Sequence, residues 1–132
     1  MYKVVLDTNI LVSAAISRLG NPAKIMSMVF DLRIQPVYNE KIIAEYENVL
    51  SRPRFNISSD DKSSFIEGIK RVGEKCSPPA SKILLPDESD RIFFDTAVTS
   101  AALVITGNSK HYPDEPFVLS PAQFLASFEN NL

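Results

Sequence analysis

This sequence has only one cysteine, no long apolar run and no excess of basic charge. Each of these absences excludes a class of protein or a cellular compartment. Cys76 is the only cysteine, which rules out an intrachain disulfide and agrees with a reducing cytoplasm as the expected compartment. No apolar run is long enough to span a bilayer and no cleavable signal pattern begins the chain, so we expect no membrane contact. The formal net charge of -2 shows no basic footprint of the kind that nucleic-acid binding usually leaves. A nucleic-acid enzyme is still compatible with this total, because clustered acidic metal ligands offset basic residues elsewhere.

Short apolar runs alternate with amphipathic stretches over 132 residues, so we treat 1–132 as a single domain. Strands are expected at residues 2–6, 34–38, 103–106 and 117–119, with one further short strand at 83–85. Helices are expected at residues 9–17, 22–32, 39–51, 58–73, 87–102 and from 121 onward. Pro36 favours an edge or irregular position for its strand. The alternation predicts an α/β fold with a parallel sheet covered by helices on both faces.

The motif Asp7-Thr8-Asn9 follows the first expected strand directly. Asp7 therefore stands at the carboxyl end of a buried strand, which is where open α/β sheets place their ligands. Asp and Thr are also good N-cap residues, so a role limited to capping the next helix explains this motif equally well. A functional role for Asp7 depends on whether other carboxylates return to the same edge of the sheet.

Asp90 is the clearest of the other acidic candidates. At about 100° per residue it shares a stripe with Phe94 and Ala97, so its side chain is expected to face the sheet. A solvated acid would normally face the other way, which favours a functional role for Asp90. The neighbouring Asp87 is explained by an N-cap role, whereas Asp95 lies off the stripe and is expected to be solvated.

Glu45 and Glu47 lie on opposite edges of the apolar stripe of the helix expected at 39–51. Periodicity alone does not choose between them, and most Glu residues on a helix flank are surface residues. From the residues alone, neither glutamate is assigned to a site.

Thr106-Gly107-Asn108 ends a second buried strand at the same sheet edge as Asp7. Gly107 permits a tight turn or a positive φ, and Asn108 offers a neutral oxygen ligand. Carboxylates that converge at such an edge cannot all stay ionised without protons or a cation. Mg²⁺ or Mn²⁺ suits an open site of oxygen ligands, where it can activate water and stabilise the leaving oxygen of a phosphodiester.

In this order and at these separations, the motifs resemble PIN-domain ribonucleases, especially the group described as toxins of bacterial toxin–antitoxin pairs. The resemblance covers nearly the whole chain. It rests on Asp7-Thr8-Asn9, on Glu45 within residues 44–53, and on the spacing from Asp90 through Thr96-Ala97 to residues 104–108. It implies a three-layer α/β/α sandwich with a central, mostly parallel sheet and a divalent cation, Mg²⁺ or Mn²⁺, bound by acidic residues.

The resemblance also implies roles for single residues. It assigns Asp7, Glu45 and Asp90 as the catalytic and metal-binding acids, and so selects Glu45 over Glu47. The family's fourth acidic position falls on Asn108, whose amide cannot act as a general base and contributes less charge, so a second tightly bound metal is not favoured. The supporting positions are Thr8 and Asn9, which would orient Asp7 or bound water, together with Thr106 and Asp87.

The implied activity is hydrolysis of single-stranded RNA by metal-activated water that attacks in line. An antitoxin protein and a second copy of the chain, in a homodimer, are the partners expected by analogy. Arg52, Arg54 and Lys110 could bind the RNA backbone, although the arginines also suit a helix C-terminus and the lysine is a loop charge. His111, the only histidine, is interpreted as a turn residue ahead of a catalytic one.

Two other functions stay open. A degenerate PIN-like domain would bind RNA or a partner protein without cutting, and Asn108 favours that alternative. A phosphoryl-transfer domain would use Asp7 as its nucleophile. Against it, no second aspartate stands two residues after Asp7 and no lysine motif follows a later strand, although both would assist the formation of a phosphoaspartate.

Overall fold

The computed structural model describes residues 1–130, so the last two residues of the predicted domain lie outside the described range. Within that range one parallel sheet has the strand order β3-β2-β1-β4-β5. The strands are β1 (Lys3–Leu6), β2 (Gln35–Tyr38), β3 (Glu74–Lys75), β4 (Leu103–Ile105) and β5 (Val118–Leu119). The α-helices are α1 (Thr8–Ile16), α2 (Asn21–Phe30), α3 (Glu40–Leu50), α4 (Ser59–Val72), α5 (Arg91–Ser100) and α6 (Pro121–Asn130).

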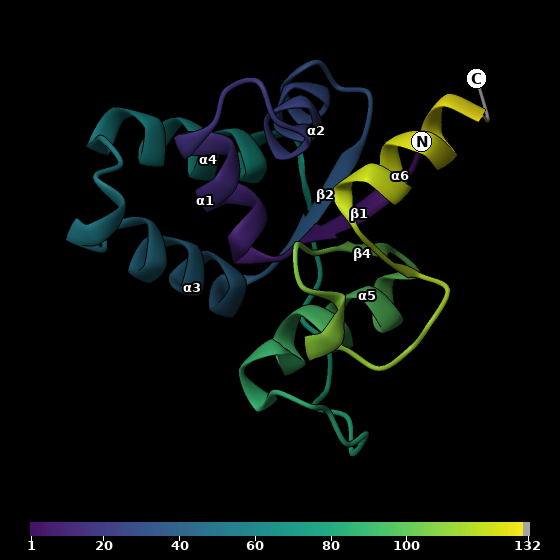
Figure 1. The fold of residues 1–132 in the computed structure, drawn as a ribbon. Helices are drawn as coiled ribbons and strands as arrows, with labels where there is room; N and C mark the ends of the chain where they lie inside the picture. The colour runs from purple at the N-terminus through teal and green to yellow at the C-terminus, as the bar shows by residue number, and fades with distance from the viewer. Residues whose placement is uncertain (131–132) are drawn as a thin grey trace.

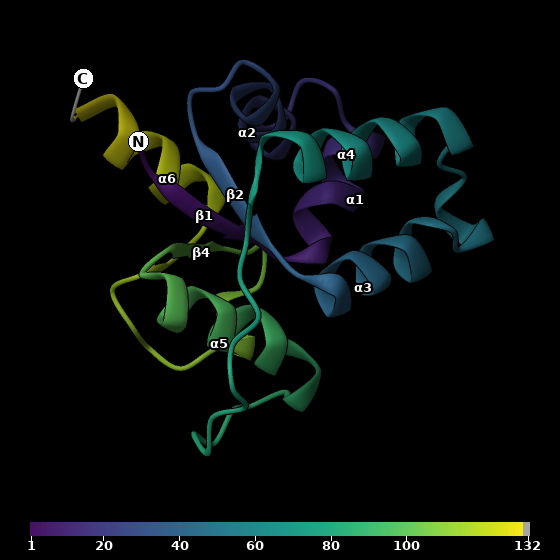
Figure 2. The same ribbon diagram turned by 180° about the vertical axis from the view of Figure 1, so that it is seen from behind.

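Helices cover both faces of the sheet, which confirms the predicted three-layer α/β/α architecture. Helix α5 lies on one face, and α2 and α6 lie over the other (Figure 1). Helices α1 and α4 pack against α2, while α3 contacts α1, α4 and α5. The view from behind shows the connection of residues 76–87 running from the end of β3 past α5 (Figure 2). No helix in residues 1–130 combines the length and the apolar character needed to cross a membrane.

Capping residues explain where several helices begin. The Asn39 side chain accepts a hydrogen bond from the Ile42 N–H at 3.0 Å, which starts α3 at the predicted place. At α6 the caps are reciprocal: the Gln123 N–H donates to Ser120 Oγ at 3.1 Å, and the Ser120 N–H donates to Gln123 Oε1 at 2.8 Å. These helix starts are therefore encoded locally in the sequence.

The two central strands end together, and this places the polar residues that follow them side by side. Leu6 of β1 is opposite Ile105 of β4, and the Asp7 N–H donates to the Ile105 carbonyl at 3.0 Å. Helix α3 is fastened to the same place, because the Tyr46 hydroxyl donates to the Leu6 carbonyl at 2.5 Å. Asp7, Thr106 and the middle of α3 thus meet at one edge of the sheet.

The predicted edge position of the strand around Pro36 is wrong, since β2 lies between β1 and β3. The Gln35 N–H donates to the Tyr2 carbonyl on the β1 side, so the next N–H along the strand would point to the opposite side. On that side β3 pairs only from Val37 onward. Pro36 therefore occupies an interior strand at a position where no partner needs its missing N–H.

The short strand predicted at 83–85 is also wrong, because that apolar stretch is not in the sheet and Leu84 is 92% exposed. The additional strand is β3, which the sequence pattern did not predict. The helix predicted at 87–102 begins as a 3₁₀ turn, η2 (Glu88–Asp90), before α5. It ends at Ser100 because Ala101 adopts a left-handed conformation with φ 57°.

Candidate functional site

Asp7 lies between β1 and α1, and its two carboxylate oxygens have different partners. Oδ1 accepts a long hydrogen bond of 3.4 Å from the Asn9 N–H, which is the predicted N-cap interaction. Oδ2 accepts shorter hydrogen bonds from the Thr106 hydroxyl at 2.8 Å and from the Tyr112 hydroxyl at 3.0 Å. The carboxylate is buried, and its strongest contacts come from chain segments about a hundred residues away rather than from the helix that it caps.

Asn9 and Thr106 form a second layer of contacts behind Asp7. The Asn9 side chain donates to Thr106 Oγ1 at 3.4 Å and accepts from the Gly107 N–H at 2.9 Å. The Asn108 N–H also donates to Thr106 Oγ1, at 3.1 Å, so the hydroxyl hydrogen is directed to Asp7. Gly107 does not have the positive φ considered above, and a Cβ there would lie 3.4 Å from Asn9 Oδ1, which is an ordinary van der Waals distance.

Asp90 ends the 3₁₀ turn η2 and is buried at 8% exposure, with an Oδ2 that accepts no hydrogen bond from the described residues. Burial, and next the charges of Asp7, Asp87 and Glu45, raise the pKa of Asp90 to about 7, while His111 lowers it. Near neutral pH this carboxyl is therefore poised between its neutral and ionised forms. The inward direction predicted for Asp90 is confirmed.

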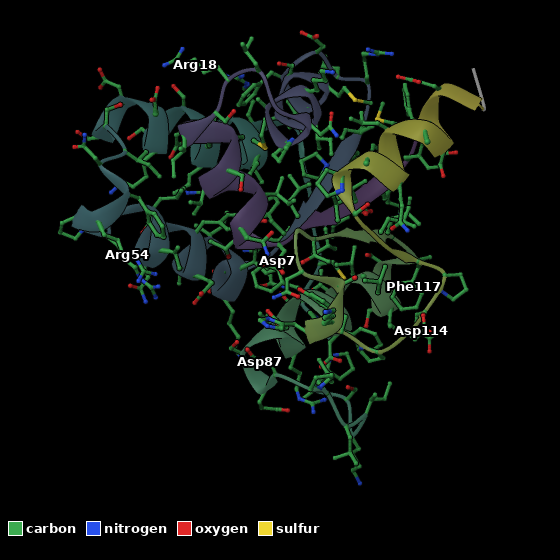
Figure 3. The ribbon with its side chains drawn as sticks, in the orientation of Figure 1. Asp7, Arg18, Arg54, Asp87, Asp114 and Phe117 are labelled. Carbon is green, nitrogen blue, oxygen red and sulfur yellow. The ribbon has the colours of Figure 1, made fainter. Side chains whose placement is uncertain are left out.

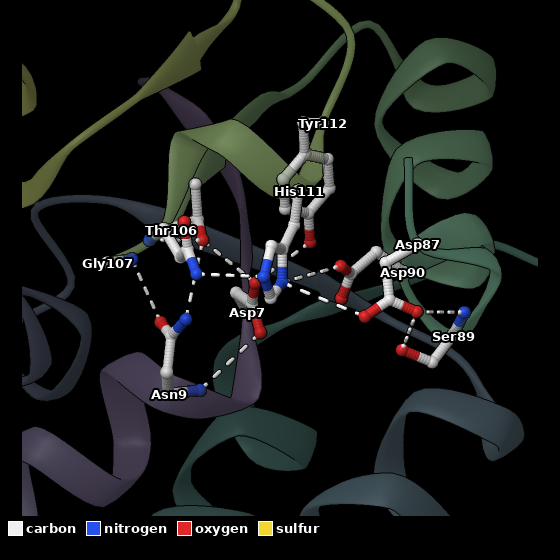
Figure 4. Close-up of polar contacts among 10 residues, drawn as sticks. Asp7, Asn9, Asp87, Ser89, Asp90, Thr106, Gly107, His111 and Tyr112 are labelled. Carbon is white, nitrogen blue, oxygen red and sulfur yellow. Dashed lines mark hydrogen bonds and ion pairs between the residues drawn. The ribbon is translucent and has the colours of Figure 1, made fainter. Parts of the chain in front are cut away.

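Asp87, Asp90 and His111 form the most compact cluster of potential metal ligands among residues 1–130, with one ligand atom from each lying within 4.8 Å of the others. His111 Nδ1 lies 3.5 Å from Asp90 Oδ2 and 3.8 Å from Asp87 Oδ2 (Figure 4). Asp87 caps η2 as predicted, and hydrogen bonds from Ser89 hold the pKa of Asp87 below its usual range. Asn108 contacts His111 as well, with 2.9 Å between its Nδ2 and the imidazole Nε2.

Glu45 is half-buried on α3, and its charge contributes to the raised pKa of Asp90. Its neighbour Tyr46 fastens the helix to the end of β1, as described above. Glu47 is exposed on the same helix. The Glu45 carboxylate is therefore close enough to Asp90 to influence its pKa. Glu45 is not part of the compact cluster of Asp87, Asp90 and His111.

The residues predicted to contact RNA are all exposed but not all near Asp7. Lys110 is in the 3₁₀ turn η3 (Ser109–His111), directly beside His111. Arg54 stacks on the Phe55 ring at 4.8 Å and lies at the end of α3 remote from Asp7 (Figure 3). Arg52 directly precedes another 3₁₀ turn, η1 (Pro53–Phe55), which contains Arg54. The predicted supporting hydroxyl of Thr8 is buried and has no hydrogen-bond partner in the described range, so no contact with Asp7 is seen.

Sequence reasoning missed Tyr112, and it placed His111 in a turn, as the structure does, without predicting its contacts with Asp87 and Asp90. Both follow β4 by only a few residues, so their position after a strand that ends at the Asp7 edge was the available signal. The prediction that Asp95 is solvated is wrong, because this side chain is 4% exposed and its Oδ2 accepts from the Ser81 N–H at 2.9 Å. Helical periodicity could not show this, since the partner comes from the irregular connection that covers α5.

Comparison with known proteins adds two findings. A family model described as PIN domain matches residues 3–110, which includes Asp7, Glu45, Asp90 and Asn108 and ends just before His111. An uncharacterized protein of Methanocaldococcus jannaschii is 28% identical over 109 residues, a stretch that covers 80% of this chain and 70% of that protein.

Proposed function

Since the chain belongs to the PIN domain family, whose members are generally nucleases that act on RNA, we propose that it is an endoribonuclease. It would hydrolyse phosphodiester bonds of single-stranded RNA with a divalent cation, Mg²⁺ or Mn²⁺. The observation that carries this proposal is the buried Asp90, whose Oδ2 lacks a hydrogen bond and which is surrounded by the carboxylates of Asp7, Asp87 and Glu45. Carboxylates this crowded need protons or a cation to compensate their charge.

The residues at this edge fit such an ion. Asp90 Oδ2 accepts no hydrogen bond from the described residues, and Asp7 Oδ1 accepts only one long hydrogen bond, so both oxygens can bind an ion. We assign Asp7, Glu45 and Asp90 as the residues that would bind the ion, with Asn108 as a neutral oxygen donor. The ion, when bound, supplies an activated water and stabilises negative charge on the phosphate.

The hydroxyl groups around Asp7 orient it for this role. Burial, followed by the charge of Asp7, raises the pKa of Tyr112 well above its usual range, so Tyr112 remains a hydrogen-bond donor. Together with Thr106 it occupies Asp7 Oδ2 and leaves Oδ1 as the oxygen with spare capacity. The pKa of about 7 applies to Asp90 without a cation, and a bound cation would hold its carboxylate in the ionised form.

Substrate contacts follow from the exposed cations. Lys110 is the first choice for an RNA phosphate contact because it adjoins His111 in the turn that faces Asp87 and Asp90. Arg52 and Arg54 lie at the remote end of α3 and would contact the strand only further along its length.

A finer proposal concerns the cellular role: a cytoplasmic toxin, controlled by an antitoxin protein and active as a homodimer. Its support is the resemblance of the sequence motifs to the toxin group. Growth arrest on expression, relieved in the Asp7→Asn variant, would support the toxin role. Light scattering of the purified protein measures the number of copies in the assembly.

A second candidate is a PIN-like domain that binds RNA without cutting it. Asn108 favours it, because an amide stands at the fourth acidic position and its side chain contacts His111. This candidate predicts RNA affinity that survives EDTA and the Asp7→Asn substitution, with no cleavage under any condition.

Cleavage of labelled single-stranded RNA separates the two candidates. We expect cleavage that requires Mg²⁺ or Mn²⁺, stops in EDTA, and falls by roughly a thousandfold in Asp7→Asn and at least tenfold in Glu45→Gln. Glu47→Gln is the matched control, because it removes an exposed carboxylate from the same helix. Circular dichroism confirms that each variant is folded. Full cleavage in EDTA, or equal losses in Glu45→Gln and Glu47→Gln, would contradict the proposed site.

A further inference from the structure

His111 brings an imidazole to a site that is otherwise made of oxygen donors. It lies in η3, which follows β4. Asp87 directly precedes the 3₁₀ turn η2, and Asp90 is the last residue of that turn, just before α5. His111 Nδ1 and the two Oδ2 atoms face one another (Figure 4). The distances of 3.5 and 3.8 Å from His111 Nδ1 suit ligand atoms of one coordination sphere, because metal–ligand bonds to nitrogen and oxygen are about 2 Å long.

An independent observation points to a ligand at the same place. Asp90 Oδ2 is buried and accepts no hydrogen bond from the described residues, and it is this atom that lies 3.5 Å from His111 Nδ1. A buried carboxylate oxygen normally has a donor, and leaving it without one is costly. A bound cation would supply the missing partner.

Asn108 has a different use in this arrangement, in which its side-chain oxygen faces His111 and is not a metal ligand. Its side-chain amide is 2.9 Å from the outer imidazole nitrogen of His111, Nε2. The amide oxygen and nitrogen of Asn exchange places by a rotation, so the same contact can accept from an Nε2–H. That leaves the Nδ1 lone pair free for a metal, and metal-binding histidines are commonly oriented by such an acceptor.

We propose that Asp87, Asp90 and His111 form a mixed oxygen and nitrogen site that prefers transition-metal ions such as Mn²⁺, Co²⁺ and Zn²⁺ to Mg²⁺. Asn108 orients the imidazole of His111. The preference follows from the imidazole, which suits transition metals, whereas Mg²⁺ favours oxygen ligands and water. The inference deepens the proposed function and rests on it only for the assignment of Asp90 as a metal ligand.

The alternative use of His111 is as a built-in cation. A protonated imidazole would neutralise Asp87 and Asp90 by itself, and a metal ion would then have to displace it. The two arrangements predict opposite effects of removing the imidazole on metal affinity, so binding measurements distinguish them.

The test titrates the full chain, free of any histidine tag, with CoCl₂ while the visible absorption of bound Co²⁺ is recorded. A parallel calorimetric titration uses MgCl₂. In His111→Gln we expect Co²⁺ affinity to fall at least roughly tenfold while Mg²⁺ affinity changes less than about threefold. Asn108→Ala should weaken Co²⁺ binding by about 10- to 100-fold. Lys70→Gln, which removes an exposed charge on α4, is the control and should match the wild type.

A measurement on the unmodified protein covers the case in which a variant misfolds. Because His111 is the only histidine, its imidazole resonances are assigned without ambiguity, and ZnCl₂ should shift them far more than MgCl₂ does. The inference would be overturned by unmoved resonances at saturating Zn²⁺ or by unchanged Co²⁺ binding in a folded His111→Gln. Mg²⁺ binding more than about threefold tighter in that variant would also overturn it.

These outcomes are separable from those of the proposed function. Loss of RNA cleavage in Asp7→Asn together with unchanged Co²⁺ binding in His111→Gln would leave the ribonuclease proposal intact and refute the mixed site. Co²⁺ binding that depends on His111, in a protein that cuts no RNA, would support the mixed site and refute the ribonuclease proposal.

Discussion

Asp90 and Asp95 are two buried aspartates in the same helical segment, but the charges around them have opposite signs. Their exposed fractions are 8% and 4%, and each has one oxygen that accepts no hydrogen bond from the described residues. Asp95 is near Arg91, one turn earlier on α5, and its other oxygen accepts from the Ser81 N–H at 2.9 Å. Asp90 is surrounded by other carboxylates, with Asp7 the most influential of them.

Asp95 and Arg91 form a clamp, by which we mean the hydrogen bonds that attach Ser81 and Ile83 of the connection to α5. Arg91 donates to the Ser81 carbonyl at 2.7 Å and to the Ile83 carbonyl at 2.6 Å, and it also pairs with Glu88. These bonds attach the connection of residues 76–87 to α5, just before Asp87 and Asp90. Burial of an aspartate thus accompanies either a structural or a ligand-binding role, and the sign of the surrounding charge distinguishes the two.

The largest expected effect separates the two aspartates by activity. Asp90→Asn should reduce RNA cleavage by roughly a thousandfold or more, because it removes a cation ligand. Asp95→Asn should retain cleavage within about tenfold of the wild type, provided that the protein is folded during the assay. Initial rates on labelled RNA measure both. Equal losses in the two variants would remove the functional distinction between these sites.

For the free energy of unfolding we expect the opposite order, in which loss of Asp95 costs more than loss of Asp90. Asp95→Ala removes the acceptor of the Ser81 N–H and a charge partner of Arg91, so we expect the free energy of unfolding to fall by about 2–4 kcal/mol. Urea denaturation in EDTA measures the change. Asp114→Ala, at an exposed loop position, is the control and should change stability by less than about 0.5 kcal/mol. A loss no larger than that of the control would show that the clamp contributes nothing.

The raised pKa of Asp90 predicts how stability depends on pH in the absence of metal. The pKa of Asp90 is 3.8 in the unfolded chain and about 7 in the fold. Between these pH values the folded protein binds the carboxyl proton more tightly than the unfolded chain does, so stability falls as the pH rises. Asp90→Asn should therefore be more stable than the wild type at pH 8, by about 1–3 kcal/mol, and the difference should vanish near pH 4. Urea denaturation across this range measures it, and a difference that stays constant with pH would contradict the assignment.

A smaller effect is expected for Arg91→Gln. The side chain would lose its charge and most of its bonds to the connection, at a cost of about 1–2 kcal/mol, so the Ser81 amide should exchange its hydrogen faster. Hydrogen exchange followed by mass spectrometry tests this locally. Unchanged exchange at residues 80–84 would show that Arg91 does not fasten the connection.

The elements that could be predicted from the sequence are those with local signals. Ser58 and Ser120 cap their helices where predicted, and the buried strands around Val5 and Val104 were evident as apolar runs. The strand β3 could not be predicted, because its two residues, Glu74 and Lys75, carry no apolar pattern and pair only through the register of β2. The apolar run at 83–85 gave a false strand because its backbone is bound by Arg91 instead.

The same division holds for the candidate site. Asp7 and Asp90 follow from strand ends and helix periodicity, and the family resemblance selected Glu45. Tyr112 was missed, because its bond to Asp7 joins positions 105 residues apart and its place after β4 was the only local signal. His111 lies in a turn as predicted, but its contacts could not be read from the local sequence, because Asp87 and Asp90 lie on a different element.

The most direct test of the account is to soak crystals of the metal-free protein with MnCl₂ and to measure anomalous scattering. We predict a peak at bonding distance from Asp90 Oδ2, bridged to the surrounding side chains at the sheet edge and absent in Asp90→Asn. Crystals saturated with Mn²⁺ that show no peak at Asp90, with its Oδ2 still unpartnered, would contradict the claim that these carboxylates are gathered to bind a cation.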